Sequence, residues 1–326
     1  MVKVAVVGCG DVASVHFAAI MANDEAQLVG VCDVDAAAAA AAAAEYGVPA
    51  FGDHLALIDA AAPDVLHICT PHHQHADIAI DALARGVNVI LEKPLASELV
   101  DGQRLVDAAA VSSAKIGICF QNRYNPTSVK LREVLDAGTY GPVVGARAQV
   151  MWTRTIDYYN AKPWRGTWAG GGGGLMMNQA VHTVDLVQWL LGDVVDVRGS
   201  IATLKFAGQI EVEDTAAAYF THASGVATSF YATLTHHESA PVLLEIACRD
   251  AVLRLEGDLS VLWPDGRREV LAPADVVQTA RTYWGASHER FINDFYASLS
   301  TPGAFWIDAA EAFKTLSIVK RWYESA

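Results

Sequence analysis

The sequence predicts an α/β fold with two domains. The first is built on a parallel sheet, and the second is an α+β domain with a large, mainly antiparallel sheet. The first third of the chain alternates short β-branched runs with helix-compatible stretches, which is typical of βαβ units. After about residue 120, longer apolar runs are joined by short turn-like segments, which is typical of hairpins. A chain of 326 residues also exceeds the size at which a single core normally stops growing.

In the first domain, expected strands and helices follow each other in order. Strands are expected over residues 2–7, 27–32, 65–69, 87–91 and 115–120. Helices are expected over residues 14–21, 36–44, 75–84 and 98–110. The second of these helices consists of nine consecutive alanines, and alanine is the strongest helix former. We place the domain boundary near Arg123, which gives domains over residues 1–122 and 123–326.

The second domain is expected to begin with a helix over residues 127–137. The expected strands are residues 143–154, 195–205, 215–222, 226–235, 242–248, 251–256 and 260–263. The helix expected over residues 178–191 interrupts them, and helices return over 288–298 and 309–323. No linker rich in glycine, proline or serine separates the two domains.

The composition excludes several classes of protein. With 23 Lys and Arg against 37 Asp and Glu, the net charge is −14, which argues against binding nucleic acid or an anionic membrane surface. No apolar run approaches the length that a bilayer crossing needs. The N-terminus lacks the basic region of a signal peptide. The five cysteines are odd in number and far apart, so we expect no disulfide framework and a cytoplasmic location.

A glycine motif follows the first expected strand. Gly8, Gly10 and Ala13 form G-x-G-x-x-A just before the first expected helix. The first glycine permits a tight turn, the second lets the backbone approach a pyrophosphate, and the small third residue lets the helix pack on the strand. The helix N-terminus offers unpaired N–H groups to phosphates. We therefore expect a dinucleotide to be bound by Gly8, Gly10, Asp11, Val12 and Ala13.

Asp33 ends the second expected strand, about 20 residues after the glycine motif, as expected for an acid that binds a ribose. A carboxylate there accepts a hydrogen bond from the ribose 2′-OH and repels a 2′-phosphate. We therefore expect NAD to be preferred over NADP. The alternative is a glycine-rich turn without a ligand, in which Asp33 caps a helix.

Further motifs resemble those of the Gfo/Idh/MocA oxidoreductases, the relatives of glucose–fructose oxidoreductase and inositol dehydrogenase. They are the E-K-P motif at Glu92-Lys93-Pro94, the T-P-x-x-x-H turn at Thr70, Pro71 and His75, the G-G-G-x-x-x-D-x-G-x-H-x-x-D segment at residues 172–185, and residues 123–126 and 288–295. The resemblance covers essentially the whole chain. It implies an NAD-binding Rossmann domain followed by an α+β domain that binds substrate and forms oligomers.

The resemblance implies a catalytic triad of Lys93, Asn178 and His182. Hydride transfer from a secondary alcohol requires a base that removes the hydroxyl proton. Lys93 follows a strand, on the edge where doubly wound sheets bind ligands. The family most often has Asp where this chain has Asn178, and an amide cannot act as a base, although it can hydrogen-bond a hydroxyl. The proton transfer then falls to Lys93 and His182, and the sequence does not rank them.

The expected ligand contacts extend beyond these residues. Further cofactor contacts are expected from Thr70, Pro71, His72, His75, Glu92, Lys93, Gln121, Trp164 and Arg165. Substrate contacts are expected from Lys93, Arg123, Tyr158, Trp164, Asn178 and His182. The aromatic segment around Trp164 could equally belong to the core or to an oligomer contact.

Several other residues have open interpretations. The glycine run 170–174 is expected to let the backbone pass close to a ligand. Asp185 either orients His182 or faces solvent or a helix terminus. His16 is interpreted as a packed or capping residue, and His288 either approaches the cleft or starts a helix. No metal site is expected, because His72, His73 and His75 lack a paired ligand spacing.

The leading hypothesis is an NAD-dependent dehydrogenase that oxidises a secondary hydroxyl of a sugar, an anhydrosugar or a cyclitol. The Asn178-Gln179 variant and the segment 164–168 look most like relatives that act on levoglucosan-type anhydrosugars or on the C3 hydroxyl of glucosides. The alternatives are an NAD-assisted glycosidase or lyase that oxidises C3 transiently, and a non-catalytic NAD- and sugar-binding regulator. The resemblance also implies a homodimer or homotetramer formed through the C-terminal sheet.

Overall fold

The computed structural model describes residues 1–274 and 287–326, and these residues form two compact units. The first unit contains Met1–Gln121 and residues 287–313, and the second contains residues 122–274 and Lys314–Ala326. A single division at residue 123 therefore does not describe the C-terminal part of the chain. The helix α11 (Ser287–Ser298) packs on α1 (Ala13–Ala22), and the Asn23 side chain donates to Asn293 Oδ1 at 2.8 Å.

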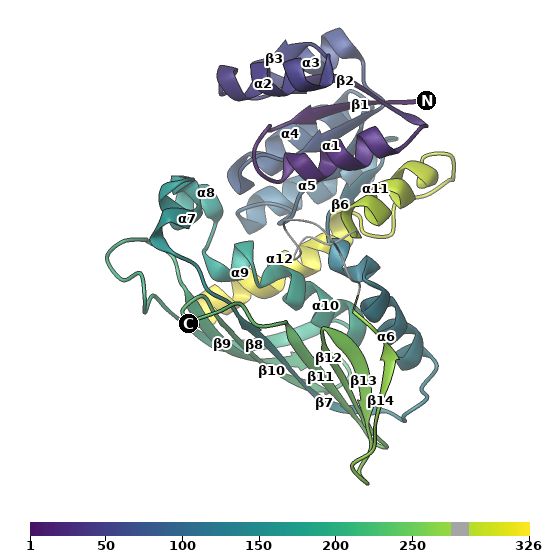
Figure 1. Ribbon diagram of the computed structural model, residues 1–326, viewed down its shortest axis with the longest axis vertical. Coiled ribbons are helices and arrows are strands. Elements are labelled where there is room, and N and C mark those ends of the chain that lie inside the picture. Colours follow the sequence, from purple (N-terminus) through teal and green to yellow (C-terminus); the bar gives the residue numbers. More distant parts are fainter. Residues whose placement is uncertain (275–286) are drawn as a thin grey trace. The chain divides into compact units, whose positions relative to one another are not determined.

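The first unit is built on a six-stranded parallel sheet, which confirms the α/β prediction (Figure 1). Its strands are β1 (Val2–Val7), β2 (Ala26–Cys32), β3 (Ala50–Phe51), β4 (Val65–Ile68), β5 (Asn88–Leu91) and β6 (Ile116–Ile118). Their order in the sheet is β3-β2-β1-β4-β5-β6. The direction of winding therefore reverses between β1 and β4, the position at which such sheets bind ligands.

Besides α11, the described part of the first unit has five helices that connect consecutive strands of its sheet. They are α1, α2 (Ala36–Tyr46), α3 (His54–Ala61), α4 (His75–Ala84) and α5 (Leu99–Val111). The alanine run forms α2 as expected: the Asp35 side chain accepts from Ala37 N and Ala38 N, and Gly47 ends the helix with a φ of 68°. The two-residue strand β3 and the eight-residue helix α3 were not expected, because such short elements leave no clear period in the sequence.

The second unit is built on an eight-stranded sheet, which confirms the large, mainly antiparallel sheet. Its strands are β7 (Val143–Met151), β8 (Val194–Ala202), β9 (Thr215–His222), β10 (Ala227–Thr233), β11 (Leu243–Cys248), β12 (Val252–Glu256), β13 (Asp258–Leu262) and β14 (Arg268–Ala272). Their order is β14-β13-β12-β11-β7-β10-β9-β8, and only β7 and β10 pair in parallel. The last strand was not expected.

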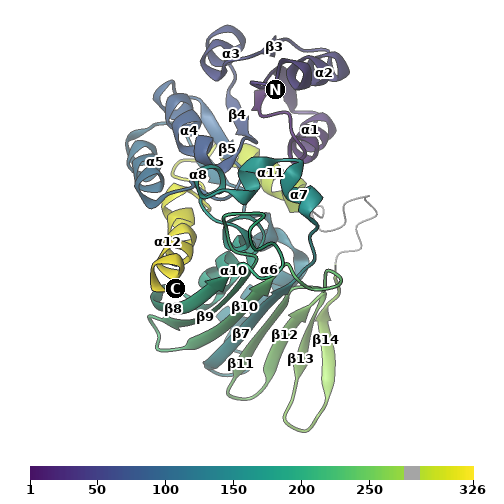
Figure 2. The same ribbon diagram turned by 90° about the vertical axis from the view of Figure 1, so that its left-hand side faces the viewer.

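The helices of the second unit lie on one face of this sheet (Figures 1 and 2). They include α6 (Pro126–Asp136), α9 (Leu175–Asn178), α10 (Val181–Leu191) and the part of α12 (Ala309–Ser325) that belongs to this unit. Two short helices, α7 (Ile156–Asn160) and α8 (Trp168–Gly171), come before α9. Within the described residues, no helix combines the length and the apolar character that crossing a membrane requires.

Trp322 of α12 anchors that helix to the large sheet. Its side chain is fully buried and meets the rings of Phe220 and Phe230 edge to face, with centroids 5.4 and 5.5 Å away. Gly199 of β8 leaves room for the indole, because a Cβ there would lie 2.3 Å from Trp322 Nε1.

We predict that Gly199→Ala lowers the free energy of unfolding by about 1–3 kcal/mol, the usual cost of overpacking a core. Gly145→Ala is the matched control, because Gly145 is also a strand glycine and a Cβ there would meet nothing closer than 3.8 Å. Urea unfolding monitored by circular dichroism measures both variants. Equal stability of the two variants would contradict this account of the packing.

Candidate active site

The glycine loop after β1 has the geometry of a dinucleotide site. Gly8 has a φ of 90°, and a Cβ there would lie 2.6 Å from the carbonyl oxygen of Cys69, so the loop requires glycine. A Cβ on Gly10 would meet nothing within 4 Å. The open space therefore lies at the second glycine, where the backbone approaches a pyrophosphate. Val12 and Ala13 lead into α1, whose first turn carries no side-chain cap and no acidic residue.

Asp33, directly after β2, holds the same loop. Its Oδ2 accepts from Cys9 N at 2.7 Å, and its Oδ1 accepts from Asp35 N at 2.9 Å. The carboxylate is half-buried, and each of its oxygens can accept a further hydrogen bond. The Asp33 side chain therefore has two tasks: it fixes the glycine loop and it can accept from a ribose hydroxyl.

The turn after β4 brings the next set of expected residues to the same edge of the sheet. Thr70 and Pro71 lead into a 3₁₀ turn at His72–Gln74, and His75 starts α4. His75 is buried, and its ring nitrogens lie 2.7 Å from the Pro94 carbonyl oxygen and 2.9 Å from that of Thr70. The ring therefore connects the turn after β4 to the turn after β5.

Glu92, Lys93 and Pro94 follow β5. The Glu92 carboxylate is buried, and its Oε1 accepts from His16 Nε2 at 3.0 Å and from His288 Nε2 at 3.1 Å. Burial acts to raise the pKa of Glu92, but the hydrogen bonds from the two histidines outweigh it and hold the pKa well below its usual value. Lys93, between two buried neighbours, is half-buried.

Two polar atoms at this edge fit the expected cofactor. Thr70 Oγ1 and Gln121 Oε1, which follow β4 and β6, are shielded from solvent and have no hydrogen-bond partner within the described part of the chain. Buried polar atoms in native proteins are nearly always paired. The residues present thus fit a polar ligand held at the carboxyl ends of β1, β4, β5 and β6.

In the second unit, the amide of Asn178 contacts Tyr158. Asn178 Nδ2 donates to the Tyr158 hydroxyl at 2.7 Å, and Gln179 Nε2 donates to the same oxygen at 3.0 Å. The Arg165 guanidinium lies over the Tyr158 ring, 4.4 Å from its centroid, and 5.7 Å from that of Trp164. Four of the expected ligand-binding residues therefore form one cluster within the second unit: Tyr158, Trp164, Arg165 and Asn178.

Asn178 and His182 do not lie on one continuous helix, so the expected helix over 178–191 was wrong at its start. Asn178 ends α9, and α10 begins at Val181 with His182 as its second residue. The helix breaks here because Ala180 N donates to Leu175 O, five residues back, and α10 then starts afresh from Ala180 O. His182 is half-buried near the start of α10.

Asp185 and Arg123 form a buried ion pair. Arg123 Nε and Nη2 donate to the two Asp185 oxygens at 2.8 and 2.7 Å, and both side chains are 1% exposed. Thr315 Oγ1 adds a third donor to the carboxylate at 3.1 Å. This pairing differs from the roles expected from the sequence, in which Arg123 contacts a substrate and Asp185 orients His182 or faces solvent.

The glycine run is required by protein contacts. A Cβ on Gly173 would lie 2.2 Å from the Tyr323 hydroxyl, and one on Gly174 would lie 2.2 Å from Glu213 O. The buried Glu213 carboxylate accepts from Gly174 N, Met176 N and the Tyr323 hydroxyl at 2.9, 2.8 and 2.7 Å. Burial raises the pKa of Glu213. Glu213 and Tyr323 were not expected in this region, because both stand among other charged and polar residues in the sequence and nothing local marks their side chains as buried.

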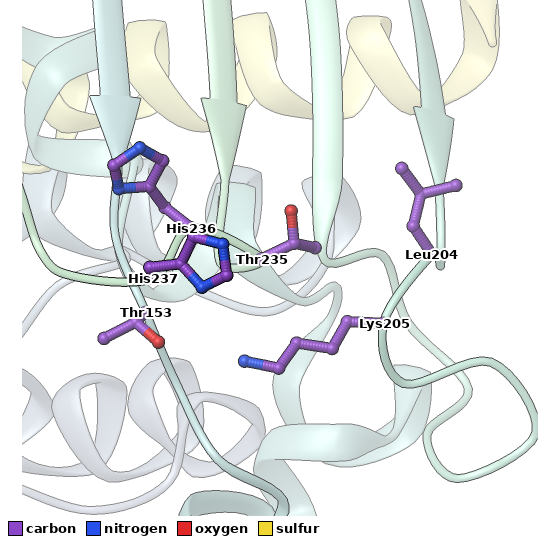
Figure 3. A pocket seen from close by; sticks show the side chains of 6 residues that line it. All are labelled: Thr153, Leu204, Lys205, Thr235, His236 and His237. Atoms are coloured by element: carbon purple, nitrogen blue, oxygen red, sulfur yellow. The ribbon is translucent and has the colours of Figure 1, made fainter.

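An open pocket of about 500 Å³ lies where β7, β8 and β10 end (Figure 3). Its lining residues are Thr153, Leu204, Lys205, Thr235, His236 and His237. Figure 3 shows Lys205 extending toward Thr153, and its ammonium donates to Arg154 O at 2.9 Å. None of the ligand-binding residues expected from the sequence lines this pocket.

Two family models match this chain, and the first describes an NAD-binding domain like the one built here on the parallel sheet. The family model described as "Oxidoreductase family, NAD-binding Rossmann fold" matches residues 2–120, and the model of the GFO/IDH/MocA C-terminal domain matches residues 128–254. A D-apiose dehydrogenase of Paraburkholderia graminis is 27% identical over 99% of this chain and 87% of its own length. A D-glucoside 3-dehydrogenase of Escherichia coli is 28% identical over 74% of this chain and 69% of its own length.

A solved structure gives the same result for the fold. The WlbA dehydrogenase from Bordetella pertussis, solved in complex with NADH and UDP-GlcNAcA, superposes with a TM-score of 0.87 at 29% identity. The superposition covers 100% of this chain and 96% of that one. With both halves matched by its models, the chain belongs to the GFO/IDH/MocA family and is an oxidoreductase with an NAD-binding Rossmann domain.

Proposed function

We propose that the protein is an NAD-dependent dehydrogenase that oxidises a secondary hydroxyl of a sugar, an anhydrosugar or a cyclitol. The observation that carries this is the half-buried Lys93 directly after β5, at the same edge of the parallel sheet as the open space at Gly10. The named activities of the two relatives are oxidations of carbohydrates, and they support the substrate class.

The chain's own residues bind the reactants and transfer the proton. When bound, NAD⁺ supplies the hydride acceptor, and the residues that would hold it are Gly8, Gly10, Asp33, Thr70 and Gln121. Lys93 accepts the hydroxyl proton as the alcohol becomes a ketone, and the reaction releases that proton to solvent. We propose that His182 shares this proton transfer.

We propose that the cluster in the second unit binds the substrate. Asn178 and Tyr158 offer an amide and a phenol, which hydrogen-bond hydroxyl groups, and their mutual contact of 2.7 Å supports this role. Trp164 offers an aromatic face that suits the C–H face of a sugar ring. Arg165 contributes donors beside it. The narrower choice of a levoglucosan-type anhydrosugar or a glucoside belongs to this proposal.

We propose a homodimer or homotetramer formed through the face of the large sheet opposite the helices. Tyr219 and Tyr231, on adjacent strands, are 52% and 37% exposed, and large exposed aromatic residues are enriched at interfaces. A cytoplasmic location is supported by the five cysteines, all of which are free thiols.

The function is tested by following NADH formation with inositols, aldoses, anhydrosugars, glucosides and UDP-sugars, in parallel with NAD⁺ and NADP⁺. The proposal expects stoichiometric NADH and ketone from at least one polyol. Release of an aglycone without accumulation of NADH would instead show the NAD-assisted glycosidase. No turnover of any kind, with tight binding of NAD⁺ and a sugar, would favour the regulator.

We predict that Asp33→Asn reduces the preference for NAD⁺ over NADP⁺, measured as the ratio of kcat/KM values, by about tenfold or more. The amide removes the negative charge but keeps an oxygen that can accept from Cys9 N. Asp33→Ala removes both, so its KM for NAD⁺ should rise further because the glycine loop loses its anchor. A wild-type enzyme active only with NADP⁺ would overturn this interpretation of Asp33.

We predict that Lys93→Met lowers kcat by roughly 10²–10⁴-fold, the usual contribution of a positioned acid or base. Binding of NAD⁺, measured by quenching of tryptophan fluorescence, should stay within about threefold of wild type, because the methionine keeps the shape of the side chain. Lys130→Met is the control, since the Lys130 side chain is 45% exposed and its ammonium pairs with Glu133 at 3.1 Å on the surface of α6. If Lys93→Met were as active as the Lys130→Met control, Lys93 could not be the base that accepts the hydroxyl proton.

We predict that Tyr231→Glu lowers the mass measured by light scattering, because a buried unpaired charge at an interface is unfavourable. Val270→Glu is the control, since it places the same charge at an exposed apolar residue of the outermost strand. A wild-type protein that is monomeric at micromolar concentration would contradict the oligomer.

A further inference from the structure

The residues on both sides of Lys93 are bound by buried histidines of the first unit. Glu92 accepts from His16, which belongs to α1, and from His288, which belongs to α11. Pro94 offers its carbonyl oxygen to His75 of α4. All three histidines are at most 3% exposed. The turn that carries Lys93 is thus held by three helices at once.

The His16 ring is itself oriented by a second layer of hydrogen bonds. Its Nδ1 lies 2.9 Å from His67 Nδ1, and His67 Nε2 lies 2.8 Å from the Tyr296 hydroxyl. An ionised carboxylate only accepts, so His16 Nε2 must carry the proton that faces Glu92. A neutral His16 then accepts at Nδ1 from His67 Nδ1–H, and His67 accepts at Nε2 from the Tyr296 O–H. Every donor in the series points toward Glu92.

This direction agrees with the charge states of the groups involved. Burial lowers the pKa of His16, and it lowers the pKa of His67 well below the usual value. Both rings therefore stay neutral at physiological pH, and the negative charge rests on Glu92. The other titratable groups near that carboxylate are Cys69, Cys119 and His75, together with the adjacent Lys93.

The His75 ring makes a different arrangement. Both of its neighbours are backbone carbonyl oxygens, which only accept, so the neutral ring donates to one of them and the protonated ring donates to both. In either form the ring fills the space between the turn after β4 and the turn after β5. Pro94 has no N–H of its own to offer, so its carbonyl is the backbone group through which it can be held.

Hydrogen bonds account for the arrangement of His16 and His288 around Glu92 without a metal ion. The ligand atoms of His16, Glu92 and His288 lie within 4.8 Å of one another, which would also suit a metal ion. The two separations of 3.0 and 3.1 Å are those of N–H···O hydrogen bonds. Each ring can supply an Nε2–H to the carboxylate, so the geometry favours hydrogen bonds over ligation.

We propose that His16, His288 and His75 are positioning residues for Lys93, which fix Glu92 and Pro94 so that the ε-amino group is presented from one backbone position. The proposal rests on the proposed function, because Lys93 must be the base for its position to matter to the rate. A displacement of about 1 Å in a reacting group can cost roughly 10²-fold in rate. The histidines need not touch the substrate or the cofactor to have this effect.

The test compares two substitutions of His288 with the same two substitutions of His222. His288→Gln keeps an N–H donor near the place of Nε2, and His288→Leu removes it. His222 is an equally buried histidine of the second unit, bonded to Gly192 O and Thr228 Oγ1 at 2.8 and 2.9 Å. His222→Gln and His222→Leu therefore control for the loss of a buried, hydrogen-bonded ring.

Three experiments are carried out on each full-length variant, and they measure four quantities. They are the melting temperature, the kcat and KM values with the polyol and NAD⁺, and the rate at which trinitrobenzenesulfonate labels Lys93 relative to Lys130, followed by peptide mass spectrometry. The labelling needs no turnover, so it reports on Lys93 even if no substrate has been found.

We expect His288→Leu to lower kcat by roughly tenfold or more, with the KM for NAD⁺ within about twofold of wild type. Labelling of Lys93 should become about threefold faster or more, because a released turn exposes the amine. His288→Gln should restore both quantities toward wild type. The His222 variants should lower only the melting temperature. If His288→Leu does not fold, His288→Asn replaces it, because its shorter amide does not reach Glu92.

Two results would overturn the inference. One is a lower melting temperature in both leucine variants with kcat and Lys93 labelling unchanged. The other is a stoichiometric amount of zinc in the wild-type protein, measured by plasma mass spectrometry, that is lost in His288→Gln, since the cluster would then be a metal site. Faster Lys93 labelling in His288→Leu without any wild-type dehydrogenase activity would instead contradict the proposed function and leave the positioning of Lys93 intact.

Discussion

The hydrogen bonds to the buried Glu92 carboxylate are the interaction on which the candidate site of the first unit depends. Burying an unpaired carboxylate costs several kcal/mol, so the fold must bring donors to the end of β5. The donors come from α1 and α11, which lie near opposite ends of the chain. This requirement gives one physical reason why residues 287–313 pack with the N-terminal sheet. It also fixes the backbone from which Lys93 extends.

The same constraint organises the loops of the second unit. Glu213 and Asp214 are adjacent, and both are at most 1% exposed. Glu213 binds the backbone of the glycine run, while Asp214 accepts from the backbone N–H groups of Leu204, Lys205 and Phe206. Two loops that are far apart in the sequence are therefore held by neighbouring carboxylates. Substitution of either acid by its amide would keep one acceptor oxygen and replace the other by an NH₂ group, which would face the N–H donors that the second oxygen accepts from.

The parts of the site that the sequence predicted depend on local spacing. The glycine motif, Asp33 and the turn after β4 each lie within a few residues of a strand end, and a parallel sheet brings all such ends to one edge. The pairs that the sequence did not predict join residues far apart: Arg123 with Asp185, and Glu92 with His16 and His288. The hydrophobic pattern of the sequence cannot predict such pairs, because it does not distinguish a charged residue that is buried in the fold from one that is exposed. The prediction of one helix over residues 178–191 was wrong for a related reason. The structure breaks the helix at Gln179 and Ala180, but the local sequence there is compatible with a continuous helix.

An amide at Asn178, where a carboxylate would also fit the chemistry of a sugar site, changes what its neighbour Tyr158 can do. Tyr158 accepts at its hydroxyl from the amides of both Asn178 and Gln179, so the donor capacity of the phenol is directed elsewhere. An aspartate at position 178 would accept the phenol proton instead and would use up that donor. The neutral amide of Asn178 instead donates to the phenol oxygen of Tyr158, whose ring lies under the Arg165 guanidinium. The amide donor of Asn178 is therefore used within the cluster, whereas a carboxylate at position 178 would reverse the direction of this hydrogen bond.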